Sequence, residues 1–203
     1  MAEDTYHHGA LRVALLEHAA AASRVDGPDA IVLRSIAQDI GVSAPAAYRH
    51  FADRDALVLA LSQQLSQDMT RFISDSVDAV APSSHSKSAA LRRFRALVHS
   101  YIEFAEENPG WYRVIFKAGA RDAPTLDPNT ETTDGLLART LDELQAVGLI
   151  TPGKREHAEL WAWSSVHGLV SLRIDGPLAR LSKQELKASE DLITDNILRA
   201  LSD

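Results

Sequence analysis

Apolar residues recur at helical spacing along most of the chain. The first such segment runs from about Gly9 to Arg24, and its apolar face comprises Leu11, Leu15, Ala19 and Ala22. Asp26-Gly27-Pro28 ends it, because glycine tolerates the left-handed conformation of a C-cap and proline cannot continue the hydrogen-bond ladder. No run of residues alternates in the manner of a strand, and no Asn-Gly hairpin signal occurs. The pattern predicts an all-α protein.

The later stripes predict a long helix followed by several shorter ones. Apolar residues between Leu57 and Val77 form one stripe, which predicts a helix from Asp53 to about Val80 with the Asp53 carboxylate as its N-cap. The other expected helices are marked by residues 91–104, a short one after Asn108-Pro109, 137–144, roughly Lys154 to Ile174, and Ser182 to Leu201, which opens with the capping box Ser182–Glu185. The polar segments 82–88 and 122–133 are expected to be a linker and a loop.

Residues 31–57 carry the most informative pattern. Ile36 and Ala37 lie in a short apolar helix, Gly41-Val42-Ser43 makes a turn, and residues 44–50 form a second short helix that Ser43 should cap. Two short helices joined by a tight turn, with a third helix after them, have the pattern of a helix-turn-helix.

The second helix of this pair should have a buried and an exposed side. Ala47 and Phe51 are expected to face inward. The residues expected to face outward are Ser43, Ala44, Pro45, Tyr48, Arg49 and His50. An exposed helix of this kind fits the major groove of DNA, where base edges carry a distinguishable donor and acceptor code. The sequence therefore predicts a DNA-binding regulator, and a tight corner in an ordinary all-α fold is the alternative.

Charge weighs against indiscriminate nucleic-acid binding. The chain has a net charge of −7, and residues 1–60 hold five Arg, no Lys and eight acidic residues, a net charge of −3. Phosphate contacts usually supply most of the affinity for DNA. The basic residues on or beside the helix-turn-helix are Arg34, Arg49, His50 and Arg54. Such a local patch can outweigh the total charge, so we expect weak non-specific binding with strong salt dependence.

Composition excludes several other classes of protein. The chain has 203 residues and no cysteine, so disulfides and thiolate metal sites are excluded. No apolar run approaches the ~18 to 20 residues of a membrane span, and the N-terminus lacks the regions of a secretory signal, so we expect a cytoplasmic protein. His7 and His8 have no evident third ligand nearby, and no metal or cofactor is expected.

Residues 31–57 resemble the DNA-binding domain of the TetR/AcrR family of bacterial transcriptional regulators. Residues 6–12, Tyr-His-His-Gly-Ala-Leu-Arg, resemble the tail that opens many members of one branch. Trp163, His167 and Gly168 resemble the Trp-His-Gly signature in the C-terminal domain of that branch, and residues 108–113 sit where such proteins carry a Pro-x-x-Tyr-Arg segment. These matches cover most of the chain.

The resemblance implies an all-α homodimer whose residues 1–55 bind an operator half-site and whose residues 56–203 bind a ligand and dimerise through the last two helices. Most such proteins are repressors that a small molecule releases from a palindromic operator. The residues expected to contact DNA are Arg34, Ser43, Ala44, Pro45, Tyr48, Arg49, His50 and Arg54. Among them, Arg49 has the charged fork that reads a guanine edge, and Tyr48, His50 and Arg54 are placed for phosphates.

Two positions depart from the family pattern, and the N-terminal tail has two possible roles. Val32 stands where the family often has a capping Ser or Thr, and Asp39 stands where a basic residue is frequent. The missing cap costs about 0.5–2 kcal/mol. Residues 6–8, Tyr-His-His, either reach into the minor groove or DNA backbone or form a disordered terminus.

Nine of the twelve aromatic residues lie between Phe72 and Trp163. A set of them with His167 is expected to line an apolar small-molecule pocket, and simple core packing is the alternative for each one. The expected pocket residues are Phe94, Tyr101, Phe104, Trp111, Tyr112, Phe116, Trp163 and His167.

Two other functional classes remain as alternatives. The net negative charge of residues 1–60 favours an all-α small-molecule binding protein that never contacts DNA. An α-helical enzyme would use His99 or His167 as a base, but the sequence has no H-E-x-x-H, G-x-S-x-G, P-loop or G-x-G-x-x-G motif. We therefore expect no enzymatic activity.

Overall fold

The computed structural model contains only helices and connecting segments among the residues that it describes, which confirms the all-α prediction. It describes the backbone of residues 2–80, 86–118, 129 and 131–202, and the side chains of these residues except 2–9 and 117–118. The chain divides into two compact units. Unit 1 is Met1–Ser66 with Asn108–Asp122, and unit 2 is Gln67–Glu107 with Ala123–Asp203. The predicted domain boundary after residue 55 stays a prediction.

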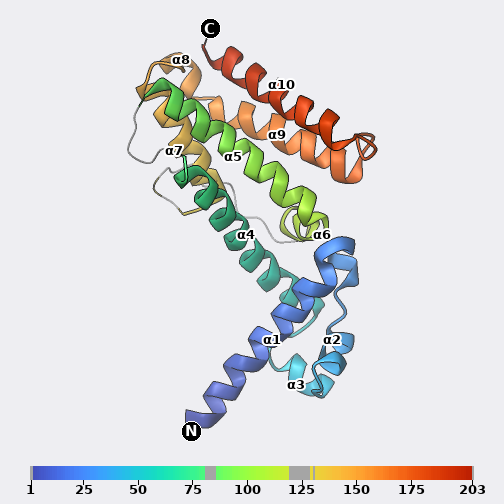
Figure 1. Cartoon of the computed structure of the whole chain (residues 1–203). Helices are drawn as coiled ribbons and strands as arrows, with labels where there is room; N and C mark the ends of the chain where they lie inside the picture. Colours follow the sequence, from blue (N-terminus) through green and yellow to red (C-terminus); the bar gives the residue numbers. More distant parts are fainter. Residues whose placement is uncertain (1, 81–85, 119–128, 130, 203) are drawn as a thin grey trace. The chain divides into compact units, whose positions relative to one another are not determined.

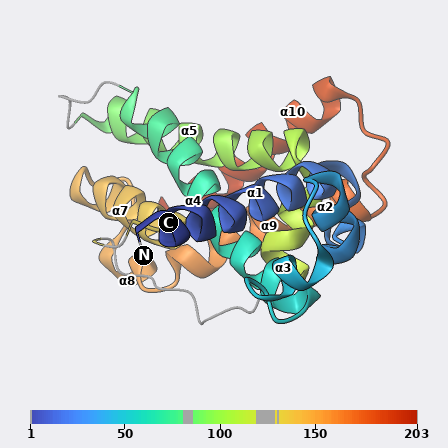
Figure 2. The ribbon, with the colours of Figure 1, turned by 90° about the horizontal axis from the view of Figure 1, so that it is seen from below.

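Unit 1 is built from the N-terminal helices and one segment that returns to them from later in the sequence. Its elements are α1 (Ala2–Asp26), η1 (Pro28–Ala30), α2 (Leu33–Asp39), α3 (Ala44–Tyr48), the first part of α4 (Arg54–Asp78), α6 (Pro109–Arg113) and the π-helical turn η2 (Val114–Ala118). α2 and α3 pack on each other and on α1 (Figures 1 and 2).

The first helix ends at Asp26, two residues beyond the predicted Arg24, and starts at Ala2, seven residues before the predicted Gly9. Gly27 follows it with φ 82° and ψ −157°, a positive-φ conformation that glycine tolerates but not the left-handed helical C-cap that the sequence predicts. Ala22 is exposed, so its predicted place on the apolar face is wrong. Ser23 is buried instead, and its hydroxyl donates to the Ala19 carbonyl at 2.7 Å. A buried hydroxyl satisfied within its own helix gives no apolar signal in the sequence.

α6 packs against the C-terminal end of α1. Trp111 Nε1 donates to the Ala20 carbonyl at 2.8 Å, and Arg113 donates to the Val25 carbonyl at 2.9 Å. Asn108 is the N-cap of α6, as predicted, but its side chain accepts from Arg24 Nε at 2.9 Å rather than from a helix amide. The segment that follows α5 is thus tied into unit 1 by polar contacts that local sequence patterns do not reveal.

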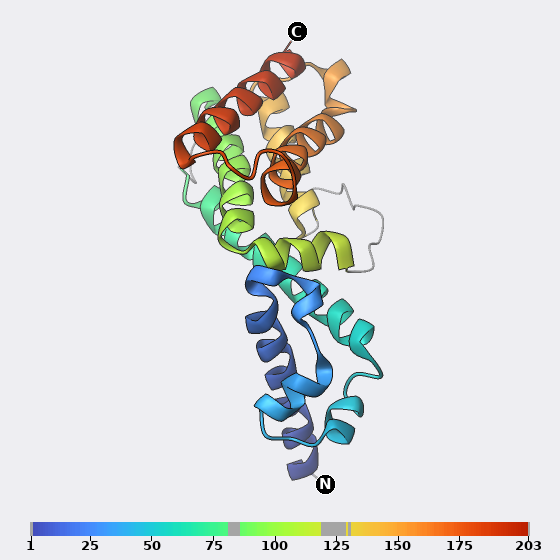
Figure 3. The ribbon, with the colours of Figure 1, turned by 90° about the vertical axis from the view of Figure 1, so that its right-hand side faces the viewer.

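Unit 2 is a bundle of helices. Its elements are the rest of α4, α5 (Lys87–Glu107), α7 (Thr133–Ala146), α8 (Pro152–Arg155), α9 (Ala158–Asp175) and α10 (Lys183–Ser202). α5 packs on α7, α9 and α10, and α9 lies beside α10 (Figure 3). The predicted capping box of α10 is confirmed, because the Ser182 amide donates to Glu185 at 2.8 Å. Most residues of the two expected polar connections lie outside the described ones.

The single helix predicted from Lys154 to Ile174 is wrong, because α8 ends at Arg155 and α9 begins at Ala158. Arg155 donates to Asp142 at 2.7 Å, to Glu159 at 2.5 Å and to the Ala138 carbonyl at 3.2 Å. These contacts join the break to α7. The sequence gives no sign of this helix break, because no proline or glycine lies between residues 154 and 158.

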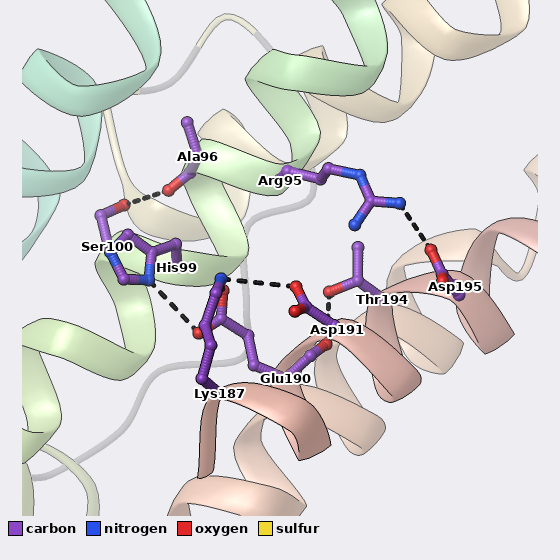
Figure 4. Close-up of polar contacts among 9 residues, drawn as sticks. All are labelled: Arg95, Ala96, His99, Ser100, Lys187, Glu190, Asp191, Thr194 and Asp195. Atoms are coloured by element: carbon purple, nitrogen blue, oxygen red, sulfur yellow. Dashed lines mark hydrogen bonds and ion pairs between the residues drawn. The ribbon is translucent and has the colours of Figure 1, made fainter. Parts of the chain in front are cut away.

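Ion pairs and hydrogen bonds also join α5 to α10 (Figure 4). Glu190 of α10 is buried, with 5% of its surface exposed. Nδ1 of His99 in α5 lies 3.2 Å from its carboxylate, and the ammonium of Lys187 in the same helix donates a hydrogen bond to it at 2.8 Å. The Glu190 hydrogen bond raises the pKa of the Lys187 ammonium. A buried carboxylate with partners on both helices fixes how α10 lies on α5.

Candidate nucleic-acid interface

The helix-turn-helix forms with the caps that its sequence predicts. Gly41 has φ 75°, so the turn between α2 and α3 uses the conformation that glycine favours. Ser43 caps α3, and its hydroxyl accepts from the Ala46 amide at 3.4 Å. Asp53 caps α4 by accepting from the Ala56 amide at 2.8 Å. Val32 is the N-cap of α2 and makes no side-chain cap bond, as its lack of a hydroxyl predicts.

α3 has the buried and exposed sides that its sequence predicts. Ala47 is fully buried, and Phe51 is 3% exposed. Tyr48 is 48% exposed, an unusual value for a large aromatic residue. The other exposed residues of the expected interface are Arg34 of α2, Ser43, Pro45, Arg49 and Arg54, whereas Ala44 and His50 are half-buried. A tyrosine and an arginine therefore stand in solvent beside the turn.

Arg54 is engaged within unit 1. Its Nε donates to the Ile31 carbonyl at 3.0 Å and its Nη2 to the Pro28 carbonyl at 2.5 Å, while Asp29 and Asp55 lie 3.7 and 3.3 Å from its guanidinium. These contacts tie the start of α4 to the segment before α2. The predicted phosphate contact of Arg54 stays a prediction, and the bonds show a structural role that the sequence does not reveal.

Arg34 and Arg49 differ from Arg54. Neither side chain forms an ion pair or a hydrogen bond with any residue within the described part of unit 1. Their charges therefore remain available to an anion despite the acidic balance of residues 1–60. Another exposed arginine of unit 1, Arg12, has its guanidinium carbon 5.0 Å from the centroid of the Phe51 ring. Sequence reasoning missed Arg12, because its partner lies far along the chain.

The predicted pocket residues are divided between the units. Trp111, Tyr112 and Phe116 belong to unit 1, where the Tyr112 and Phe116 rings are 4.8 Å apart. The members in unit 2 are Phe94, Tyr101, Phe104, Trp163 and His167.

Within unit 2, Tyr101 Oη and His167 Nδ1 form a 2.8 Å hydrogen bond, and the Trp163 ring lies edge-on to His167 at 6.0 Å. Phe94 is fully buried and Phe104 is nearly so. The pocket stays a prediction, as does the role of the N-terminal Tyr-His-His, whose side chains lie outside the described residues.

Comparison with known proteins agrees with this architecture in both parts of the chain. Residues 15–61 match the family described as bacterial regulatory proteins, tetR family. Residues 94–197, more than half of the chain, match the Tetracyclin repressor-like, C-terminal domain. The chain belongs to the TetR family. The family's members are described as bacterial regulatory proteins and the family is not enzymatic, so the alternative of an enzyme with a His99 or His167 base is set aside.

Individual relatives match the chain at modest sequence identity. A protein with unknown function from Rhodococcus sp. RHA1 is 30% identical, covers 98% of both chains and has a TM-score of 0.76. The nucleoid occlusion factor SlmA of Actinobacillus pleuropneumoniae serotype 5b (strain L20) is 28% identical over 90 residues, 44% of this chain and 41% of that protein. The HTH-type transcriptional activator FasR of Mycolicibacterium smegmatis is 32% identical over 91 residues, 45% of this chain and 38% of that protein. The chain thus spans less than half the length of the curated relatives that it matches.

Two further observations concern membrane spans and metal sites. Within residues 2–80, 86–118, 129 and 131–202, no helix is both long and apolar enough to cross a membrane. The same residues hold no group of three or more His, Cys, Asp or Glu side chains that could bind a metal ion.

Proposed function

We propose that this chain is a homodimeric repressor of the Trp-His-Gly branch that binds a palindromic operator through α3 and leaves it when a small molecule binds. The observation that carries the proposal is the exposed pair Tyr48 and Arg49, held by Ser43 at the start of α3 and by buried Ala47 behind it. Arg49 supplies a planar fork for a guanine edge, and Tyr48 a hydroxyl for a phosphate. Family membership favours this function over a small-molecule carrier that never binds DNA.

Dimerisation is proposed through α9 and α10. Leu160 and Leu172 of α9 are 65% and 45% exposed, and Leu192 of α10 is 61% exposed. Ser164 and Gly168 lie between the two leucines of α9 at four-residue spacing, and a Cβ on Gly168 would meet nothing within 4 Å. Exposed leucines around small residues allow a second helix to approach closely. A two-fold dimer would present two copies of α3 to a two-fold operator.

The effector is proposed to bind in unit 2 beside Tyr101, Trp163 and His167. The hydrogen-bonded Tyr101–His167 pair offers polar atoms among aromatic walls, as small-molecule sites usually do. Repression is the common outcome in the family, but one matched relative bears the name of an activator. A ligand acts only through different affinities for the DNA-binding and released conformations.

The test uses operator DNA recovered by in vitro selection with the parent protein. Gel-shift titration with Arg49→Ala and Tyr48→Ala should show affinity losses of roughly 5- to 150-fold, since a base or phosphate contact contributes about 1–3 kcal/mol. Arg92→Ala is the matched control, because Arg92 is exposed on α5 in unit 2. Operator binding by both α3 variants at parent affinity would refute the α3 interface.

Reporter transcription and sedimentation test the finer parts of the proposal. A reporter downstream of the selected operator should become active when the regulator is deleted, and activity lost on deletion would show activation instead. Sedimentation should give a dimer for the parent and a monomer for Leu160→Glu. A monomeric parent would refute the α9–α10 interface.

A further inference from the structure

Arg12 of α1 lies against the residue that closes the α3 segment. Its guanidinium carbon is 5.0 Å from the centroid of the Phe51 ring, and Phe51 is buried with 3% of its surface exposed. The Phe51 amide donates to the Ala47 carbonyl of α3 at 3.1 Å. The ring is therefore fixed relative to α3. The stack in turn holds the charge of Arg12 near the C-terminal end of that helix.

The guanidinium of Arg12 keeps its hydrogen-bonding edge available. Arg12 is exposed, and its side chain has no ion pair or hydrogen bond to another residue in the part of the chain that the structure describes. A contact between the guanidinium and the face of a ring uses none of the N–H donors as hydrogen bonds, so these donors remain available to an anion. This arrangement suits bidentate binding of a phosphate.

We propose that Arg12 binds a backbone phosphate of the DNA, next to the contacts of Tyr48 and Arg49. The inference rests on the proposed function and adds a residue from α1 to the interface. Stacking on Phe51 restricts the Arg12 side chain before DNA arrives, so less side-chain entropy is lost on binding. The contact fixes the position of α3 on the duplex without reading sequence.

The experiment measures how the affinity for DNA depends on salt concentration. Arg12→Met removes the charge and keeps an apolar stem against Phe51, whereas Arg12→Lys keeps the charge without the planar fork. Arg92→Met is the control, because Arg92 is an exposed arginine of unit 2 that bonds only to Ser88 among the described contacts. The probes are the selected operator and a duplex of random sequence, each titrated by fluorescence anisotropy over a series of salt concentrations.

Loss of one phosphate contact per protomer should lower the magnitude of the slope of log K against log salt by about 0.9 per protomer. Arg12→Met should show this change and bind both duplexes roughly tenfold more weakly at low salt. Arg12→Lys should keep the parent slope, and Arg92→Met should match the parent throughout.

An unchanged slope for Arg12→Met would overturn the inference even if the affinity fell, because a residue that only packs on Phe51 contributes no counterion release. Failure of the proposed function gives a different result. In that case the parent protein itself would bind neither duplex in a salt-dependent manner, and both proposals would fall together.

Discussion

A single β-carbon at Gly110 should break the attachment of α6 to α1. A Cβ built on Gly110 would overlap the carbonyl oxygen of Ser23, and it would lie 2.7 Å from both carbonyl atoms of Arg24. All three obstructing atoms belong to the backbone of α1, which cannot rotate away as a side chain can. Ordinary van der Waals contact begins at 3.4 Å. Gly110→Ala therefore requires α6 to withdraw from α1.

The cost follows from what this withdrawal strains. Overpacking of this kind typically costs about 1–3 kcal/mol. The bonds from Trp111 to Ala20, from Arg113 to Val25 and from Arg24 to Asn108 would stretch with it, and a typical hydrogen bond contributes about 1 kcal/mol. Alanine regains about 1 kcal/mol of helix propensity. If all three bonds are lost, we expect a net loss of about 3–5 kcal/mol in the free energy of unfolding of unit 1.

Denaturant unfolding followed by Trp111 fluorescence measures this loss. Trp111 is the only tryptophan of unit 1, so replacing Trp161 and Trp163 by phenylalanine makes the signal specific to that unit. Gly153→Ala is the control, because a Cβ on Gly153 would meet nothing within 4 Å. If Gly110→Ala unfolds at the same denaturant concentration as Gly153→Ala, the close approach of α6 to α1 is not real.

Three further predictions follow from caps and buried charges. Val32→Ser should supply the missing cap of α2 and raise the free energy of unfolding by about 0.5–2 kcal/mol, and a lower denaturation midpoint would contradict it. Glu190→Gln should lower that free energy by about 1–3 kcal/mol in denaturant titrations, because the buried carboxylate shared by His99 and Lys187 is lost, and an unchanged midpoint would show the cluster to be inert. Burial raises the pKa of the Asp134 carboxyl in the folded state above its ordinary value of 3.8. The stability that the protonated carboxyl contributes is therefore present below pH 3.8 and is lost as the pH rises through the folded pKa. Asp134→Asn should therefore raise the melting temperature at neutral pH and change it little below pH 3.8, and an equal effect at both pH values would argue against a desolvation origin.

Helix caps and glycine turns, which depend only on residues close together in the sequence, could be predicted from it. Ser43 and Asp53 cap the helices that follow them, and Gly27 and Gly41 adopt positive φ where their turns require it. Each feature depends on hydrogen bonds or steric limits within a few residues, so a local pattern specifies it.

Features that depend on partners distant in sequence could not be predicted. Arg54 bonds to carbonyls before α2, and the Arg155 contacts with α7 accompany a helix break that no breaker residue announces. Asn108 was recognised as a cap, but its side chain bonds to Arg24 of α1. In each case the side chain is long or polar enough to serve several partners, and the fold decides which one it meets.

The acidic balance of residues 1–60 and a DNA-binding role are compatible once paired and unpaired charges are distinguished. In unit 2, arginines such as Arg93 and Arg155 are neutralised by carboxylates at 2.5 to 2.7 Å. In unit 1, Arg34 and Arg49 have no such partner among the described residues. A phosphate that reached the exposed side of α3 would therefore meet guanidinium groups that no carboxylate of the described residues neutralises. If Arg49 contacts the operator as proposed, we expect such a surface to lower the affinity for random sequence more than the affinity for the operator, so that its acidic charge would favour specificity.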